Sequence, residues 1–229
     1  DIHSEYQSAF TLEDGENFTL NFLDVEKIKL PYWLLNSEEL ESMFIESNEQ
    51  NSHNQVSQFK KAVILNKEKH NPGLSKITYD TPVYFSIQEV FNYISNLNNA
   101  TSYDNNGVRY FASITNNEKY DENRLWDLIN FEESTGNSKH PTLKVKVSKA
   151  GGFNGEFDRF VSRLETKLRD KRLAFILNPT KNDDSIYCTS DFDEILKQFL
   201  GYLNKANISI IDLSGVPFEV LSITVNVIN

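Results

Sequence analysis

Three side chains able to bind a metal ion or position a water molecule alternate at the start of the chain. Asp1, His3 and Glu5 are separated by single residues, so an extended backbone would place them on one side in a row of period two. Carboxylates and an imidazole are ligands for divalent cations. Short acidic clusters are also common in turns at strand ends. The pattern therefore predicts either a metal- or water-binding row or a polar turn.

A second pair of candidate site residues lies near the other end of the chain. Residues 211–219 (IDLSGVPFE) pass from an apolar strand through small residues into a segment whose Pro217 suits the first turn of a helix. In parallel α/β sheets, ligands bind at the carboxyl ends of strands, where helix N-termini direct backbone N–H groups outward. We therefore expect Asp212 and Ser214 at a ligand-binding edge. The alternative is a structural turn in which Ser214 or Gly215 satisfies free helix amides.

The sequence lacks the usual phosphate-binding loop. No Gly-x-x-x-x-Gly-Lys-Ser/Thr segment is present, and residues 151–155 (GGFNG) lack the lysine and the hydroxyl that phosphate and Mg²⁺ binding require. We therefore expect no bound cofactor for this chain alone. Its single cysteine and its four histidines of unrelated spacing give little support to a zinc site.

Charge is distributed unevenly. The formal net charge is −10, and the first fifty residues already hold twelve acidic side chains against Lys27 and Lys29. An acidic segment of this kind is unsuited to lying along nucleic-acid phosphates. Residues 159–172 are basic instead, so any contact with nucleic acid or nucleotide is expected there, with a solvated helix surface as the alternative. Their basic residues are Arg159, Arg163, Lys167, Arg169, Lys171 and Arg172.

Apolar periodicity divides the chain into three zones. Residues 1–33 read as short extended pieces, with a β-prone stretch at 17–23. Residues 34–140 are mostly helical, with helical spacing of apolar residues at 56–63 and 87–97. Asn36 with Glu39, and Ser86 with Glu89, match the capping-box pattern at helix N-termini. The polar stretch 98–123 predicts a loop or hairpin.

The third zone, residues 141–229, shows the clearest alternation of elements. A half-buried strand is predicted at 143–147 and an amphipathic helix at 157–168. A strand at 173–177, a helix at 192–203 and a strand at 208–213 follow, and a further helix begins at Pro217. Strand–helix–strand units are right-handed with parallel strands, and a parallel sheet needs cover on both faces. The predicted fold class is therefore α/β, with a partial parallel sheet and a mostly helical insertion.

Four motifs, in order along the chain, resemble the central region of bacterial HerA-type ATPases. They are residues 1–6 (DIHSEY), 30–40 (LPYWLLNSEEL), 155–165 (GEFDRFVSRLE) and 211–219 (IDLSGVPFE). This family belongs to the HerA/FtsK branch of RecA-like P-loop motor proteins. Its members are hexameric rings that translocate duplex DNA with ATP, and they often work with a nuclease in DNA-end processing or anti-phage defence.

The resemblance implies a place in the motor for each candidate residue. The chain would be the stretch of RecA-like core between the Walker A and Walker B motifs, an internal piece of a larger protein that binds ATP and Mg²⁺. Asp1, His3 and Glu5 would face the nucleotide, and Asp212 and Ser214 would lie at the same sheet edge. Arg159 or Arg163 would act in trans on a neighbouring subunit's nucleotide. Ser4 stands where the family usually has glycine; if the position needs a positive φ, serine costs about 1 kcal/mol there.

Two other function classes fit the same residues. The helical zone and the acidic N-terminal part would suit a non-catalytic interaction or oligomerisation module. A metal hydrolase using Asp1, His3 and Glu5 is the remaining alternative. No apolar run reaches the ~18 residues that cross a bilayer, so no membrane partner is expected, and the lone Cys188 suits a reducing cytoplasm.

Overall fold

The structure is a computed structural model that describes residues 1–10, 19–114, 118–134, 139–140, 144–150, 153–202 and 205–228. The chain divides into two compact units, described separately below. The first unit comprises Asp1–Met43, Thr78–Tyr84 and Lys167–Asn229. The second unit comprises Phe44–Ile77 and Phe85–Thr166.

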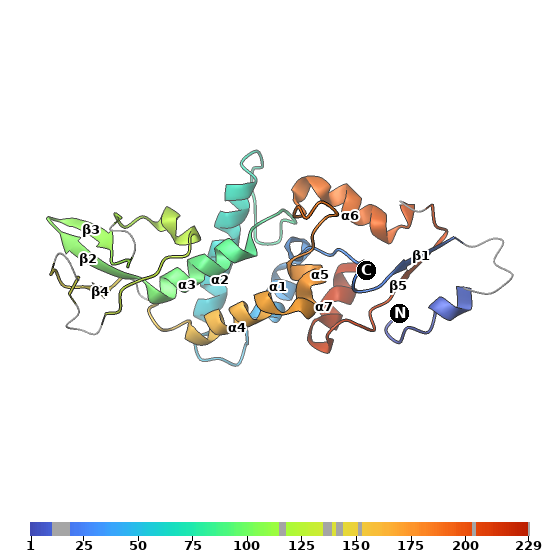
Figure 1. Ribbon diagram of the computed structural model, residues 1–229, viewed down its shortest axis with the longest axis horizontal. Helices are drawn as coiled ribbons and strands as arrows, with labels where there is room; N and C mark the ends of the chain where they lie inside the picture. Colours follow the sequence, from blue (N-terminus) through green and yellow to red (C-terminus); the bar gives the residue numbers. More distant parts are fainter. Residues whose placement is uncertain are drawn as a thin grey trace. The chain divides into compact units, whose positions relative to one another are not determined.

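The first unit contains a small parallel sheet. Strands β1 (Leu20–Leu23) and β5 (Ile208–Ile211) pair in parallel, with Leu20 opposite Ile208 and Leu23 opposite Ile211, and Figure 1 shows them side by side. The helices of this unit include α5 (Ala174–Leu177), α6 (Phe192–Phe199), α7 (Phe218–Ile228) and most of α1 (Ser37–Phe44). Short 3₁₀ turns are η1 (Gln7–Phe10), η2 (Tyr32–Leu34), η4 (Lys171–Leu173) and η5 (Thr189–Asp191).

The predicted strand at 173–177 is wrong, because this segment is helical. Leu173 ends η4 and α5 follows directly from Ala174. The turn is started by Asp170, whose side chain accepts a hydrogen bond from the Arg172 amide. A short, wholly apolar run gives no period by which a buried strand can be told from a buried helical turn. The parallel partner of β5 is therefore β1, from the other end of the chain.

The second unit combines helices with an antiparallel sheet. Its elements are α2 (Ser52–His70), α3 (Ile87–Asn99), β2 (Thr101–Asn105), β3 (Val108–Phe111), η3 (Glu122–Trp126), β4 (Ser148–Lys149) and most of α4 (Asp158–Arg169). The strand order is β3-β2-β4, and α3 runs almost directly into β2 (Figure 1). The hairpin reading of the polar stretch after residue 98 is thus confirmed by β2 and β3.

Aromatic side chains build the core of the second unit. Phe59 on α2 packs edge-on against Phe44, with ring centroids 5.6 Å apart, and against Phe160 on α4 at 5.9 Å. All three are fully buried. Such edge-to-face pairs add about 0.5–1.5 kcal/mol each beyond their burial. The apolar stripe predicted for 157–168 is the side of α4 that fills this core.

The structure has the predicted class: a mixed α/β fold with a small parallel sheet and several helices. Of the predicted strand at 143–147, residue 143 lies outside the described residues, and β4 begins only at Ser148. Residues 17 and 18 of the β-prone stretch and residue 203 of the predicted helix also lie outside them. Among the described helices, none combines the length and apolar content needed to cross a membrane.

Candidate functional site at the sheet edge

The two terminal motifs meet at the carboxyl end of β5. The Asp212 amide donates to the Leu23 carbonyl of β1 (2.7 Å), and the next amide, Leu213, donates to the Asp1 carbonyl (2.6 Å). The Asp1 nitrogen donates in turn to the Ile211 carbonyl (2.9 Å). Since successive strand amides point to opposite sides, Asp1 lies along the edge of β5 that faces away from β1.

Asp212 is the buried hub of this edge. Its carboxylate accepts a hydrogen bond from the Ser4 hydroxyl (Oγ–Oδ2, 2.8 Å) and another from the Ser214 amide (N–Oδ1, 2.9 Å), and the residue is only 7% exposed. Burial raises the pKa of Asp212, but the hydrogen bonds from Ser214 and Ser4 outweigh burial and hold the pKa below its ordinary value. The carboxylate is therefore kept ionised and fixed in direction.

Asp1 organises the loop that follows it. Its Oδ1 accepts the His3 amide (3.1 Å) and its Oδ2 accepts the Tyr6 amide (3.0 Å). Ser4 has a φ of 56°, in the left-handed region. These features turn the backbone instead of extending it, so the expected period-two row of Asp1, His3 and Glu5 does not form. The polar-turn alternative describes this segment.

The side chains of His3 and Glu5 are exposed. Among the described residues, no group of three or more His, Cys, Asp or Glu side chains is arranged to hold a metal ion. The structure thus brings together Asp1, Ser4, Asp212 and Ser214, and leaves His3 and Glu5 at the surface of the same loop. Ser4 therefore has the positive φ considered above for this position, at which the HerA-type ATPases that the chain resembles usually have glycine.

A close backbone approach leads from this edge into α7. A Cβ added to Gly215 would lie 3.0 Å from Cγ2 of Val25, so any larger residue would push Val25 aside. The chain then bends through the Val216 amide, which donates to the Leu213 carbonyl (3.0 Å), and α7 follows Pro217 as predicted. Gly215 and this turn therefore connect the sheet edge to α7.

The two candidate trans arginines, both in the second unit, differ sharply. The Arg163 guanidinium donates to the Phe44 carbonyl (2.9 Å) and to the Glu49 carboxylate (2.8 Å), and its side chain is 16% exposed. The hydrogen bond from Arg163 is the main cause that lowers the pKa of Glu49. Arg163 is thus committed within its own unit.

Arg159, one turn earlier on α4, is exposed. It lines a cavity of about 340 Å³ together with Glu49, Glu156 and Asp158. Of the two arginines, Arg159 is the one whose position leaves it accessible to another molecule.

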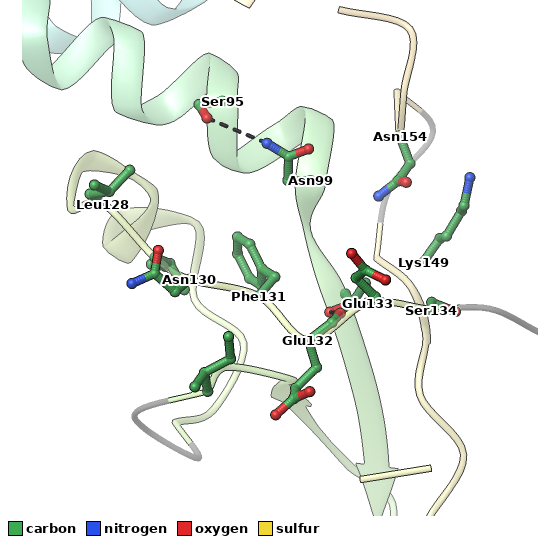
Figure 2. A pocket seen from close by; sticks show the side chains of 13 residues that line it. Ser95, Asn99, Leu128, Asn130, Phe131, Glu132, Glu133, Ser134, Lys149 and Asn154 are labelled. Carbon is green, nitrogen blue, oxygen red and sulfur yellow. Dashed lines mark hydrogen bonds between the residues drawn. The ribbon is translucent and has the colours of Figure 1, made fainter. Parts of the chain in front are cut away.

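A larger cavity of about 590 Å³ lies between the end of α3 and the segment around residues 128–134. Figure 2 shows the Asn99 amide donating to the Ser95 hydroxyl, 3.5 Å away. Glu133 and Lys149 also line this cavity. Its wall is mixed, and includes the exposed Ile114 and Leu128. Sequence reasoning did not find this cavity, since its residues come from segments that share no motif.

The comparison with known families decides the relationship. The family model described as the central domain of helicase HerA matches residues 1–229. The chain belongs to the HerA central-domain family. The resemblance predicted from the four motifs is thereby confirmed. A comparison with curated proteins found no match.

Proposed function

We propose that this HerA-family chain is the central part of an ATP-driven motor that translocates duplex DNA. The match of the whole chain to the HerA helicase central domain carries the proposal. The complete motor would be a hexameric ring in the cytoplasm, working with a nuclease or another partner in DNA processing or anti-phage defence. ATP and Mg²⁺ would be held mainly by residues other than those of this chain, because it has no phosphate-binding loop.

Among the described residues, the sheet edge holds no group of three or more acidic, cysteine or histidine side chains placed to hold a metal ion. Each carboxylate oxygen of Asp1 and Asp212 already accepts a hydrogen bond from within the first unit. We therefore assign no step through the metal ion to this chain. In the proposal, Asp212 and Ser214 position the nucleotide-side edge of the sheet, and the Asp1 carboxylate holds the turn that carries His3 and Glu5 toward the nucleotide.

In the proposed ring, Arg159 would contact the nucleotide of the neighbouring subunit. Ring ATPases often complete a nucleotide site with an arginine from the next subunit, because a guanidinium stabilises charge on a transferring phosphoryl group. The exposure of Arg159 supports this role. The contacts of Arg163 favour a structural role for that residue instead.

The test compares ATP hydrolysis by the protein purified from its natural source with hydrolysis by the 229-residue chain. We expect the natural protein to hydrolyse ATP faster when duplex DNA is added, and the 229-residue chain to show no turnover. Mg²⁺-dependent turnover by the pure chain would contradict the assignment of phosphate binding to residues outside it. If duplex DNA does not change the rate of ATP hydrolysis by the natural protein, the proposal of a DNA translocase is contradicted.

A non-catalytic self-association module is a second candidate, favoured by an exposed apolar row that runs along α6 to its C-cap residue, Leu200. Phe192, Leu196 and Leu200 follow at intervals of four residues and are 38%, 44% and 73% exposed. That spacing places them on one helix face. If this face binds a second copy of the chain, Leu196→Glu should shift sedimentation toward monomer, while Leu74→Glu, at another exposed leucine, should not. Equal sedimentation of both variants and the parent chain would remove this candidate.

A further inference from the structure

A stretch of the second unit carries positive charge without any acidic residue. Between Glu133 and Glu156 the sequence contains four lysines and no Asp or Glu, in a chain whose net charge is −10. The four are Lys139, Lys144, Lys146 and Lys149. The residues of this stretch that lie outside the described ranges are all uncharged in the sequence.

Three of these lysines belong to a hairpin. Lys139 pairs with Lys146 across an antiparallel bridge. The His140 amide donates to the Val145 carbonyl (2.8 Å), and the Lys144 amide donates back to the His140 carbonyl (2.9 Å). We call the described residues 139–140 and 144–147 the lysine hairpin.

Packing of the valines fixes the direction of the lysines. Val147 is buried against Tyr103 and Ala112, and Val145 packs on the same cluster. Because side chains alternate along an extended segment, Lys146 projects to the opposite side. Lys139, Lys144 and Lys146 are all exposed.

None of the three lysines forms an ion pair within the described part of the chain. Asp104 of β2, the strand that pairs with β4, is the register partner of Arg109 of β3. Lys139 and Lys146 lie directly opposite each other across the bridge. Like charges in such a pair destabilise the pairing of the two strands. Lys149 differs, because it lines the 590 Å³ cavity with Glu132 and Glu133 (Figure 2).

We propose that the lysine hairpin contacts the phosphate backbone of duplex DNA. The proposal deepens the translocase function and rests on its DNA partner, but not on ATP hydrolysis. An anion between Lys139 and Lys146 would relieve the repulsion between their charges. Lysine side chains can contact phosphates whatever the base sequence, without help from other groups. An acidic protein partner fits less well: protein interfaces centre on apolar or aromatic anchors, and the valines of this hairpin are turned inward.

The experiment measures how salt weakens binding of the chain to a labelled duplex of mixed sequence, without nucleotide, between about 50 and 200 mM salt. Each phosphate contact contributes about −0.9 to the slope of log K against log salt. The double variant Lys139→Gln, Lys146→Gln should therefore lose about 2 from the slope. The control Lys76→Gln, Lys205→Gln removes the same charge from two exposed lysines elsewhere and should keep the slope.

Several outcomes would overturn the proposal. One is an equal slope for the double variant and the control variant, and another is failure of the parent chain to bind the duplex. A third is that, when the same titration is repeated with an acidic polypeptide in place of the duplex, the double variant loses binding to the polypeptide only. Circular dichroism of each variant checks the fold, and Lys139→Arg, Lys146→Arg should restore the slope if charge is the cause. Since no nucleotide is present, a motor that proves inactive on ATP would leave this result unchanged.

Discussion

At the residue scale, Ser4 combines a conformational cost with a hydrogen bond. Its φ of 56° is unfavourable for a residue with a Cβ, while its hydroxyl bonds to the buried Asp212 carboxylate. Ser4→Ala keeps the strain and loses the bond, so we expect a loss of about 1 kcal/mol in the free energy of unfolding. Ser4→Gly loses the same bond but relieves about 1 kcal/mol of strain, so it should be nearly neutral.

Urea unfolding of the two variants measures this difference. The glycine variant should have the higher midpoint, and the alanine variant the lower one, with equal slopes. If both substitutions cost the same, the positive φ is not a source of strain. If neither has an effect, the hydrogen bond to Asp212 contributes nothing measurable to the stability of the edge.

The two arginines of α4 make a matched pair for a second prediction. Arg163→Met removes a largely buried, charge-assisted interaction and leaves Glu49 without its guanidinium, so we expect a loss of about 2–3 kcal/mol in stability. Arg159→Met should change stability by less than about 0.5 kcal/mol, because the side chain is exposed.

Denaturant unfolding of the chain gives the stability of both variants, and ATP hydrolysis by the natural protein gives their effect on function. A role in trans predicts that Arg159→Met lowers hydrolysis while leaving stability intact. Destabilisation by Arg159→Met as large as that of Arg163→Met would contradict the assignment of separate roles.

At the element scale, local signals explain most of what the sequence predicted. The capping box of α1 forms as expected: the Asn36 amide donates to Glu39 (2.9 Å) and the Glu39 amide donates to Asn36 (3.0 Å). The capping box of α3 forms only by half. The Glu89 amide donates to Ser86 (3.3 Å), but the Glu89 carboxylate turns to α2, a tertiary contact that no local pattern reveals.

The site divides in the same way. The position of Asp212 and Ser214 follows from a strand-to-helix pattern and was predictable. For residues 1–6 the sequence left two alternatives, an extended row and a polar turn, because the residue types alone do not decide between an extended and a bent backbone. Pairing of β5 with β1 was hidden, since it joins residues almost two hundred positions apart and the apolar run at 173–177 offered a nearer partner.

The contact made by Glu89 supports a prediction about pH. Its carboxylate binds Lys69 (2.9 Å), His70 (2.9 Å) and Asn66 (2.6 Å), at the end of α2. Burial raises the pKa of Glu89, but these three partners outweigh burial and hold the pKa below its ordinary value. A lowered folded pKa gives stability that is fully present above the unfolded pKa and is lost as pH falls through the folded value.

Glu89→Gln should therefore cost about 1–2 kcal/mol at neutral pH and much less at about pH 3. Unfolding midpoints of the parent chain and the variant, measured at both pH values, test this difference. Gln88→Glu, one residue earlier on an exposed position of α3, serves as a control for general charge effects. A cost that is equal at both pH values would mean that the carboxylate charge is not what joins α3 to α2.

At the scale of the whole molecule, the acidic and basic residues are distributed as the two proposed binding functions would require. The acidic first fifty residues fall mostly in the first unit, which carries the candidate nucleotide-side edge. The lysine hairpin belongs to the second unit. The proposed DNA contact and the candidate nucleotide-side edge therefore lie in different compact units of one chain, and each can be probed separately.

The two tryptophans allow the stability of each unit to be followed by itself. Trp33 is buried in the first unit, where its indole donates to the Tyr187 carbonyl (3.2 Å), and Trp126 packs on Tyr93 in the second, with ring centroids 4.7 Å apart. Fluorescence of Trp126→Phe thus reports unfolding of the first unit, and fluorescence of Trp33→Phe reports the second. Because the chain divides into two compact units, we expect two transitions with different urea midpoints.

Substitutions within one unit should then move only that unit's transition. Ser4→Ala should lower the midpoint seen by Trp33 and leave that seen by Trp126, whereas Arg163→Met should do the reverse. Coincident transitions that shift together in both backgrounds would mean that the units unfold as one cooperative body. In that case a substitution in the lysine hairpin would also affect the sheet edge through stability, and DNA binding would need to be compared at equal fractions of folded chain.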